Sequence, residues 1–559
     1  MRIPTLLEGY RSGEATPRSI IASLLPLLDA DPALWISRFS DRELLARAQD
    51  LSARDPESLP LYGVPFAVKD NIDVEGLPTT AACPAFSYQP DADAPVVRAL
   101  REAGAICLGK TNLDQFATGL VGVRSPHGVP ANPFGASFIP GGSSSGSAVA
   151  VARGLAAFSL GTDTAGSGRV PAAFNNLYGW KPTRGLLSTR GVVPACRSLD
   201  CVSVFANSPD DLQTVSRIVC GFDPGDPFAR NLPLRPRRQP QRIGIPLEPQ
   251  LEFFGDEDSA RLWRDAVRSL EARGLRILEV DISAFLEAAR LLYEGPWVAE
   301  RFLATKDFLG AMHPVTRSII EKGREGTAAD AFAAQYRLAD LKRRSEPAWE
   351  SIDVLCLPTA PTIFTLAEVE ADPITTNSRL GTYTNFLNLL DLCGLAVPAG
   401  FRPDGLPFGI TFVARAHEDK SLFALAGTPP DTEGTIDIAV CGAHMSGLPL
   451  NHQLTSRGGE FLRAARTAPA YRLFALDDKR PGLVRVANGG ASLALEVWRL
   501  PETEAGSLLA GIPSPLGLGR VILDDGSETC GFLCEACAAA GKPDITAHGG
   551  WRAWLKARP

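Results

Sequence analysis

Two glycine-rich segments carry hydroxyl side chains at a spacing that suits nucleophilic catalysis. Residues 141–147 read Gly-Gly-Ser-Ser-Ser-Gly-Ser, and residues 161–171 read Gly-Thr-Asp-Thr-Ala-Gly-Ser-Gly-Arg-Val-Pro. Glycine lets the backbone approach a bound group closely, so such loops can bring hydroxyls and N–H groups to one place. A serine attacks a carbonyl only when a base takes its proton, and histidine is the usual base. Of the six histidines only His127 lies near these segments, which favours another base.

Lys69 is the alternative base, because it ends an apolar run that begins at Gly63. A lysine can take a proton when burial lowers its pKa, since desolvation penalises the ammonium form. At the end of a buried strand the amine would lie out of water, where a second serine can relay the proton. Taken by itself, the same pattern also fits a lysine that is solvated beyond the end of its strand.

Together these segments resemble the amidase-signature family. The matching stretches are residues 63–71, Gly-Val-Pro-Phe-Ala-Val-Lys-Asp-Asn, with 141–146 and 161–169, and 74 residues separate Lys69 from Ser143, with 24 more to Ser167. The resemblance implies a Ser-Ser-Lys triad that hydrolyses amides through an acyl-enzyme. It makes Ser167 the nucleophile, Ser143 the relay hydroxyl that follows a cis peptide bond, and Lys69 the base.

The resemblance also implies an oxyanion hole built from backbone N–H groups beside the nucleophile. These groups belong to Thr164, Ala165, Gly166 and Ser167. Fixed donors of this kind stabilise the negative charge that develops on the carbonyl oxygen during attack. For Asp163 and Arg169 we expect a structural role, in which the pair braces the loop.

A stretch further along the chain resembles the allophanate hydrolase branch of the family. It is residues 292–301, Leu-Tyr-Glu-Gly-Pro-Trp-Val-Ala-Glu-Arg, and the segment from Ile436 onward shows the same resemblance. The resemblance implies that Tyr293 and Arg301 hold the substrate, with backbone contacts at Gly122. An arginine can bind the carboxylate of allophanate through two parallel hydrogen bonds. Hydrolysis of the terminal amide would release ammonia and leave N-carboxycarbamate, which loses carbon dioxide.

In the C-terminal part, the resemblance points to His444 as a residue for that decarboxylation. His444 lies in Val440-Cys-Gly-Ala-His-Met, directly after an expected strand, where a structural histidine fits equally well. Cys530, Cys534 and Cys537 have a spacing seen in some iron-sulfur and zinc sites. Buried thiols explain them adequately, so we expect no metal and no cofactor.

Strands and helices alternate along the first part of the chain, which predicts an α/β core. We expect helices over 19–29, 41–52, 96–102 and 148–154, and buried strands over 63–69, 105–109, 354–358 and 409–413. The resemblance specifies an amidase-signature fold, in which helices flank a mixed β-sheet core.

Residues 426–434 are polar and rich in Pro and Gly, which is typical of a linker. We therefore expect a catalytic domain over 1–425 and a C-terminal domain of the allophanate hydrolase type over 435–559. Short apolar strands over 436–441, 471–475, 483–487 and 493–499 predict a small α+β fold there. The resemblance implies that this fold is gamma-glutamyl-cyclotransferase-like.

Composition narrows the class of protein. The 559 residues are 45% hydrophobic and 21% charged, with a net charge of −7, which is ordinary for a globular protein and gives no reason to expect nucleic acid. There is no secretory signal and no apolar stretch long enough for a bilayer, and eleven cysteines fit reduced thiols, so we expect a cytoplasmic protein without a membrane partner. The resemblance adds a homodimer and a functional pairing with a urea carboxylase or with triazine-degrading enzymes.

Three other interpretations remain. Residues 142–146 formally fit the G-x-S-x-G elbow of an α/β-hydrolase, with Ser144 as nucleophile, although no strand is expected directly before it. A broad-specificity amidase, or the amidase component of a transfer-RNA amidotransferase, would carry the same triad. A binding module with a degenerate triad is disfavoured because the Lys and both Ser residues are intact.

Overall fold

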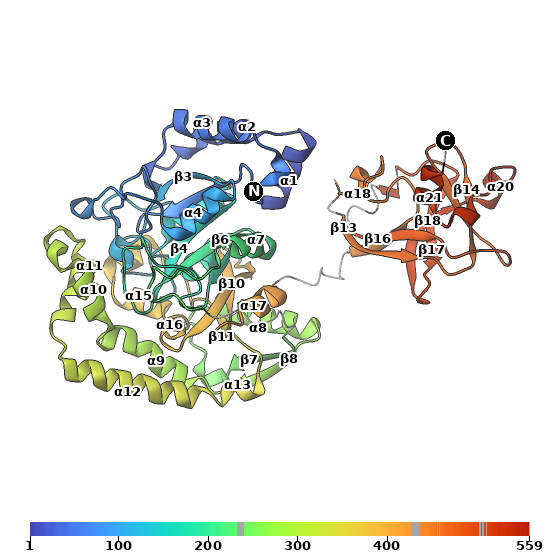
Figure 1. Ribbon diagram of the computed structural model, residues 1–559. Helices are drawn as coiled ribbons and strands as arrows, with labels where there is room; N and C mark the ends of the chain where they lie inside the picture. The colour runs from blue at the N-terminus through green and yellow to red at the C-terminus, as the bar shows by residue number, and fades with distance from the viewer. Residues whose placement is uncertain are drawn as a thin grey trace. The chain divides into compact units, whose positions relative to one another are not determined.

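The computed structural model describes residues 1–231, 240–426, 435–455, 457, 459–501, 505, 508–509 and 511–557. The chain divides into two compact units, Met1–Gly427 and Thr428–Pro559 (Figure 1). Apart from its first residue, the linker predicted over 426–434 lies outside the described residues.

The first unit is built on an 11-stranded mixed sheet with the order β1-β3-β2-β4-β6-β5-β10-β11-β9-β7-β8. Strand β2 is parallel to β3 and β4, and β7 is parallel to β8 and β9, whereas the other neighbours are antiparallel. This architecture is the α/β fold with a mixed sheet that the sequence predicts. The strands are β1 (Trp35–Arg38), β2 (Pro65–Lys69), β3 (Ile106–Thr111), β4 (Phe158–Asp163), β5 (Tyr178–Lys181), β6 (Cys201–Ala206), β7 (Arg242–Pro246), β8 (Arg276–Val280), β9 (Val354–Pro358), β10 (Leu392–Phe401) and β11 (Pro407–Arg415).

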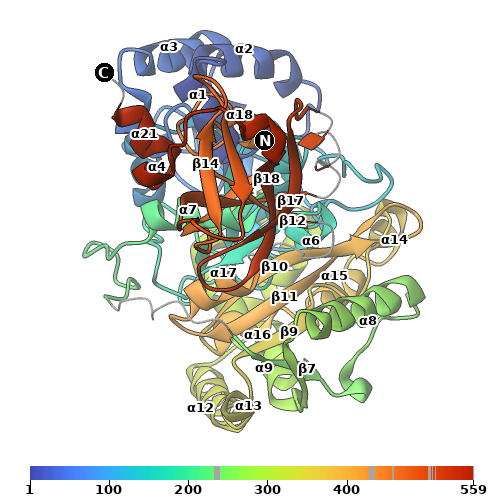
Figure 2. The same cartoon turned by 90° about the vertical axis from the view of Figure 1, so that its right-hand side faces the viewer.

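Helices flank this sheet. They are α1 (Ile3–Ser12), α2 (Pro17–Leu28), α3 (Asp41–Leu51), α4 (Pro95–Glu102), α5 (Ser145–Ala152), α6 (Val170–Phe174), α7 (Pro209–Val219), α8 (Glu257–Ala272), α9 (Ser283–Glu294), α10 (Trp297–Thr305), α11 (Pro314–Ile320), α12 (Ala328–Ser345), α13 (Ala348–Ser351), α14 (Leu366–Ala371), α15 (Thr375–Leu380), α16 (Phe386–Leu389) and α17 (Asp419–Ala426). At the end of the sheet where β8 is the edge strand, α13 contacts β7 and α8 contacts β8, and both ribbon views place α9 and α13 near β7 (Figures 1 and 2). Among the described residues, no helix combines the length and apolar character needed to cross a membrane.

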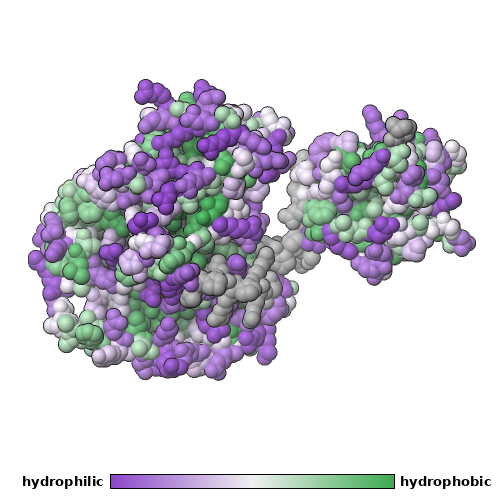
Figure 3. All heavy atoms as spheres, in the orientation of Figure 1, coloured by the Kyte–Doolittle hydropathy of each residue, from purple (hydrophilic) through white to green (hydrophobic). Residues whose placement is uncertain are grey.

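The N-terminal helices show how local sequence sets these elements. Helix α3 starts with a capping box in which Ser40 and Glu43 satisfy each other's backbone N–H groups, and it buries Leu44 and Ala48, four residues apart on one face. Asp41, Arg42, Glu43 and Asp50 are exposed, and hydrophilic side chains predominate over α3 in Figure 3. The predicted helix over 41–52 is confirmed.

Strands β2, β3 and β4 place the glycine-rich loops at one edge of the sheet. Every residue of the three strands is buried, as expected for parallel strands covered on both faces. Because the strands are parallel, their carboxyl ends meet at the same edge, where ligands commonly bind in α/β sheets. Lys69, Thr111 and Asp163 are the last residues of the three strands.

The second unit contains a five-stranded sheet in the order β13-β16-β12-β18-β17 and a separate pair, β14-β15. The strands predicted over 436–441, 471–475, 483–487 and 493–499 are confirmed as β12, β14, β15 and β16, with shifted ends for three of them. The elements are β12 (Thr435–Val440), β13 (Glu460–Arg466), β14 (Tyr471–Ala475), β15 (Pro481–Arg485), β16 (Ala494–Pro501), β17 (Leu516–Ile522) and β18 (Glu528–Cys534), with the short helices α18 (His452–Thr455), α20 (Ala536–Ala539) and α21 (Trp551–Lys556).

Candidate active site

Lys69 lies at the end of β2 with no solvent exposure. Its Nζ is 2.8 Å from Ser143 Oγ and 2.8 Å from Thr162 Oγ1. The lysine therefore contacts two hydroxyls rather than water, which excludes the solvated strand-end alternative. Burial lowers the pKa of Lys69 to about 7, although nearby carboxylates, of which Asp114 acts most strongly, oppose the shift. A large fraction of the amine is therefore neutral near pH 7 and able to accept a proton.

Ser143 links the lysine to the nucleophile loop. Its Oγ lies 2.9 Å from Ser167 Oγ, so Lys69, Ser143 and Ser167 form one continuous hydrogen-bonded chain. The Gly142–Ser143 peptide bond is cis. Glycine is required at 142, because a Cβ there would lie 2.0 Å from the carboxylate of Asp114. The structure thus brings together the three residues that the sequence assigns to a triad.

Ser167 lies in the loop between β4 and α6 and is 3% exposed. Gly166 before it has φ 144°, and a Cβ at this position would lie 2.5 Å from Thr384 Oγ1, so the turn depends on glycine. Within the described residues, no acceptor takes the backbone N–H of Ala165, Gly166 or Ser167. These donors, with that of Thr164, are available for an oxyanion.

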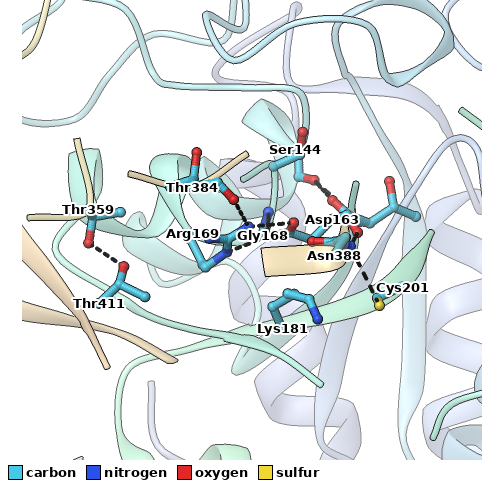
Figure 4. Close-up of polar contacts among 12 residues, drawn as sticks. Ser144, Asp163, Gly168, Arg169, Lys181, Cys201, Thr359, Thr384, Asn388 and Thr411 are labelled. Atoms are coloured by element: carbon cyan, nitrogen blue, oxygen red, sulfur yellow. Dashed lines mark hydrogen bonds and ion pairs between the residues drawn. The ribbon is translucent and has the colours of Figure 1, made fainter. Parts of the chain in front are cut away.

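A buried ion pair braces the nucleophile loop (Figure 4). Arg169 donates to both carboxylate oxygens of Asp163 at 2.9 Å, and both side chains are fully buried. The same carboxylate accepts from Gly168 N at 3.0 Å, and Arg169 also donates to the carbonyl of Thr384 at 3.1 Å. Asn388 donates to the main-chain carbonyl of Asp163 at 2.8 Å. These hydrogen bonds tie the loop to the residues around it, which is the structural role expected for the pair.

Asp200 fixes the first residue of the predicted oxyanion hole. Thr164 Oγ1 donates a short hydrogen bond to Asp200, which also accepts from the N–H groups of Ala195 at 2.8 Å and Cys196 at 3.1 Å. Burial raises the pKa of Asp200 to about 6, while these hydrogen bonds act in the opposite direction. The loop around 195–196 is thereby tied to the loop that carries Ser167.

Arg301 and Tyr293, the predicted substrate-binding residues, lie close to each other. Arg301, on α10, is 2% exposed, and its guanidinium carbon is 5.6 Å from the centre of the Tyr293 ring. Arg301 Nη1 donates to Thr118 Oγ1 at 2.9 Å and to Ala117 O at 3.3 Å. Its buried Nε has no hydrogen-bond partner in the described part of the chain. A buried guanidinium with a free donor is suited to an anionic ligand.

A second buried arginine also contacts Thr118. Arg124 donates to the carbonyls of Thr118 at 3.1 Å and Pro373 at 2.6 Å, and its Nε is also buried without a partner among the described residues. Asp114 orders this segment, since its carboxylate accepts from the N–H groups of Gly122 and Arg124, both at 2.9 Å. The N–H of Gly122 is therefore occupied, and only its carbonyl remains for a ligand.

Several functional candidates escaped the sequence analysis. Thr162 contacts Lys69 and Asn71, and Asp114 donates its N–H to the carbonyl of Ser143 and accepts from the main-chain N–H of Arg124. Asn71 and Thr162 lie inside two of the three matching motifs, which could have singled them out. Arg124 follows Gly122 by two residues, but only the fold shows that its side chain is buried.

Ser144, the nucleophile of the α/β-hydrolase alternative, is engaged elsewhere. Its Oγ donates to the carbonyl of Thr162 at 3.2 Å, and the residue directly precedes α5. No strand of the described chain leads directly into it. The strand-to-helix elbow that this alternative requires is therefore not formed.

His444 in the second unit lies at the wall of a separate cavity. The ring stacks on Phe532 with centroids 4.7 Å apart, and its Nε2 is 3.0 Å from Gln453 Oε1. Burial lowers the pKa of His444, which favours the neutral imidazole. The cavity has a volume of about 200 Å³, and Arg480 and Phe532 are among the residues that line it.

The three clustered cysteines do not converge on a common point. Cys530 and Cys534 lie on β18, and Cys537 lies on α20 and is exposed. Across the residues that the structure describes, no three His, Cys, Asp or Glu side chains are grouped so that they can hold a metal ion.

A buried lysine, two hydroxyls and free N–H groups at the edge of a mixed α/β sheet define the class of serine amidohydrolases. The profile of the Amidase family matches residues 20–423, and that of the allophanate hydrolase C-terminal domain matches residues 436–556. The chain belongs to the Amidase family.

Two of the similar proteins match both units, and a third matches the first unit. Urea amidolyase from Saccharomyces cerevisiae is 44% identical over 98% of this chain, and the chain spans 32% of that protein's length. The solved structure of an allophanate hydrolase from Kluyveromyces lactis is 42% identical, with a TM-score of 0.72 over 100% of this chain and 99% of its own. A glutamyl-tRNA(Gln) amidotransferase component from Acidobacterium capsulatum is 32% identical over 74% of this chain and 96% of its own.

Proposed function

We propose that this chain is an allophanate hydrolase that cleaves the terminal amide of allophanate with Ser167. The observation that carries the proposal is the chain of hydrogen bonds from Lys69 through Ser143 to Ser167, at 2.8 and 2.9 Å. Likeness to the K. lactis enzyme over the full length of both chains supports the choice of substrate.

Acylation begins when Ser167 Oγ attacks the terminal carbonyl carbon. Its proton passes to Ser143 Oγ while the proton of Ser143 passes to Lys69 Nζ, so one proton leaves the nucleophile and the lysine gains one. The N–H groups at 164–167 stabilise the resulting oxyanion. The tetrahedral intermediate then expels ammonia, which receives the proton back through Ser143, and a carbamoyl ester that still carries the carboxylate remains on Ser167.

Deacylation repeats the same proton path with water. A water molecule transfers a proton through the relay as its oxygen attacks the ester carbon. Collapse of the intermediate returns the proton to Ser167 and releases N-carboxycarbamate. That product loses carbon dioxide and decays to a second molecule of ammonia.

The carboxylate of allophanate accounts for the two buried arginines. Burying a guanidinium costs free energy that an anionic partner recovers, and the buried Nε atoms of Arg301 and Arg124 have no hydrogen-bond partner among the described residues. In this proposal Arg301 binds the substrate carboxylate directly, Tyr293 adds a hydrogen bond, and the Gly122 carbonyl accepts from the substrate amide. Arg124 raises the positive potential at the same place.

We assign the loss of carbon dioxide to the second unit, with His444 as its candidate residue. Support comes from the match to the allophanate hydrolase C-terminal domain and from the cavity beside the ring. The same proposal includes a catalytic domain over 1–425 and a C-terminal domain over 435–559. It also includes a homodimer, a cytoplasmic location and a functional pairing with a urea carboxylase or triazine-degrading enzymes.

The alternative of a broad amidase or a transfer-RNA amidotransferase component has less support. The protein from Acidobacterium capsulatum shares 74% of this chain, which leaves the second unit unexplained. An uncharged amide, of the kind that a broad amidase cleaves, provides no negative charge for the two arginines.

Ammonia release from allophanate, with glutamine as the competing amide, tests the function. We expect release from allophanate and none above background from glutamine, and Ser167→Ala should abolish it. Turnover of glutamine in place of allophanate would contradict the proposal.

A further inference from the structure

Residues 117–124, which we call the substrate loop, contact both arginines of the proposed substrate site. Arg301 donates to the carbonyl of Ala117 and to the hydroxyl of Thr118. Arg124 lies in the loop itself and donates to the carbonyl of Thr118. Beyond residue 117 the substrate loop forms neither helix nor strand. Its shape, and with it the placement of both guanidinium groups, therefore depends on contacts with the surrounding protein.

Asp114, which precedes the substrate loop, supplies contacts at both of its ends. Its Oδ2 accepts from the N–H of Gly122 and its Oδ1 from the N–H of Arg124, each at 2.9 Å. Its main-chain carbonyl accepts from the N–H of Ala117, also at 2.9 Å. Asp114 has no solvent exposure, so water cannot easily replace it as the acceptor. A carboxylate suits this position because each of its oxygens meets a separate donor.

Glycines let this carboxylate lie close to two loops. A Cβ on Gly119, in the substrate loop, would lie 2.7 Å from Asp114 Oδ2, and a Cβ on Gly142 would lie 2.0 Å from it. The N–H of Asp114 donates to the carbonyl of Ser143 at 3.1 Å, and the N–H of Gly142 donates to the carbonyl of Leu120 at 2.8 Å. Asp114 thus holds the relay serine through its main chain and holds the second half of the substrate loop through its side chain. A change confined to the side chain can separate these two contacts.

We propose that Asp114 is a positioning residue for the substrate carboxylate, because it holds the substrate loop and through it the contacts of Arg301 and Arg124. The inference rests on the proposed function for the identity of the substrate, but the order of the loop can be measured without any substrate. It predicts that loss of one carboxylate oxygen weakens the binding of allophanate and leaves the activation of Ser167 intact.

Asp114→Asn tests the proposal, because asparagine has nearly the same shape but only one acceptor oxygen. Its amide nitrogen would face one of the two N–H donors, which displaces the loop. We expect KM for allophanate to rise by about 10-fold or more while kcat changes by less than about 3-fold. An unchanged KM would overturn the proposal.

Labelling by a fluorophosphonate probe, which has no carboxylate, reports the activation of Ser167 in the same variant. Asp114→Asn removes a carboxylate that raises the pKa of Lys69, so at about pH 9 the amine is neutral in both proteins. We expect the two labelling rates at that pH to agree within about 3-fold. Labelling that slows as much as KM rises would show that the side chain serves the triad, and would overturn the proposal.

Hydrogen exchange of the full chain measures the order of the substrate loop directly. In Asp114→Asn we expect the N–H groups of residues 117–124 to exchange about 10-fold faster, while helix α5, which follows Ser143, keeps its protection. Unchanged exchange in the loop, or an equal rise in both segments, would overturn the proposal. A wild-type chain that released no ammonia from allophanate would contradict the proposed function instead, and the exchange result would still decide whether Asp114 orders the loop.

Two further variants separate this role from a general loss of stability. Asp419→Asn changes an equally buried carboxylate whose partners are Trp180 and Thr183, and KM should stay within about 2-fold of wild type. Asn377→Ala removes an uncharged acceptor of a main-chain N–H in the substrate loop, at 2.8 Å, so KM should again rise, by about 3-fold or more. An equal rise in KM for Asp419→Asn and Asp114→Asn, or none for Asn377→Ala, would overturn the proposal. Asn377→Ala decides the matter alone if Asp114→Asn does not fold, as thermal unfolding will show.

Discussion

Lys69 in the first unit and His444 in the second are both buried titratable side chains, but their surroundings differ. Lys69 has no exposure and contacts the hydroxyls of Ser143, in the loop before α5, and of Thr162, on β4; Ser143 in turn contacts Ser167. His444 contacts Gln453 on α18 and borders a cavity of about 200 Å³. The first arrangement provides a continuous path for a proton before a substrate arrives, whereas the second depends on the ligand that enters the cavity.

This comparison predicts that substitutions in the first unit act most strongly, beginning with the nucleophile. Ser167→Ala should lower ammonia release from allophanate by about 10⁴-fold or more, because no other hydroxyl is placed to form the acyl-enzyme. Ser144→Ala is the matched control, since this neighbouring hydroxyl bonds only to the β4 backbone, and its rate should stay within about 10-fold of wild type. The reverse ranking would restore the α/β-hydrolase alternative.

Loss of the buried arginine should have the next largest effect. Arg301→Gln removes the charge that faces the substrate carboxylate, so kcat/KM for allophanate should fall by about 10² to 10³-fold, mostly through KM. Steady-state kinetics with allophanate and with an uncharged amide of similar size separate the two contributions. An equal loss for both amides would show that Arg301 supports the fold and not the carboxylate.

The pH profile of amide cleavage should follow the protonation of Lys69. Burial lowers the pKa of Lys69 to about 7, and only the neutral amine accepts a proton. As pH falls below this value the ammonium form accumulates, so kcat/KM should drop by about 10-fold per pH unit. Ammonia release measured from about pH 5 to pH 9 checks this. A flat profile across that range would mean that another group is the base.

The smallest effect on amide cleavage is expected in the second unit. His444→Ala should leave the first release of ammonia within about 2-fold of wild type, because the triad is complete in the first unit. The rate of carbon dioxide release should fall instead. Parallel assays of ammonia and carbon dioxide distinguish the two steps, and a loss of amide cleavage would show that the units are coupled.

The sequence predicted the fold class and the residues of the triad but not all of the strands, and the failures have physical reasons. Strands β17 and β18 were missed because they contain glycines, which lower strand propensity. Gly519 and Gly531 pair directly across these strands, and a Cβ on Gly519 would lie 2.7 Å from Leu533. The close packing of β17 against β18 therefore requires glycines, and the same glycines weaken the strand pattern in the sequence.

In the candidate site too, the sequence predicted some residues and missed others. Lys69, Ser143 and Ser167 were predictable because their motifs are long and specific. The contact of Arg124 with Pro373 joins residues 249 positions apart, and no local pattern reports it. The bond from Asn71 to Thr162 likewise exists only because β2 and β4 are neighbours in the sheet.

The central claim is that the neutral amine of Lys69 draws the proton of Ser167 through Ser143, and Lys69→Ala tests it most directly. The measurement is the rate of ammonia release from allophanate by the folded full-length variant. The account predicts a loss of about 10⁴-fold or more. A rate within about 10-fold of wild type would contradict it.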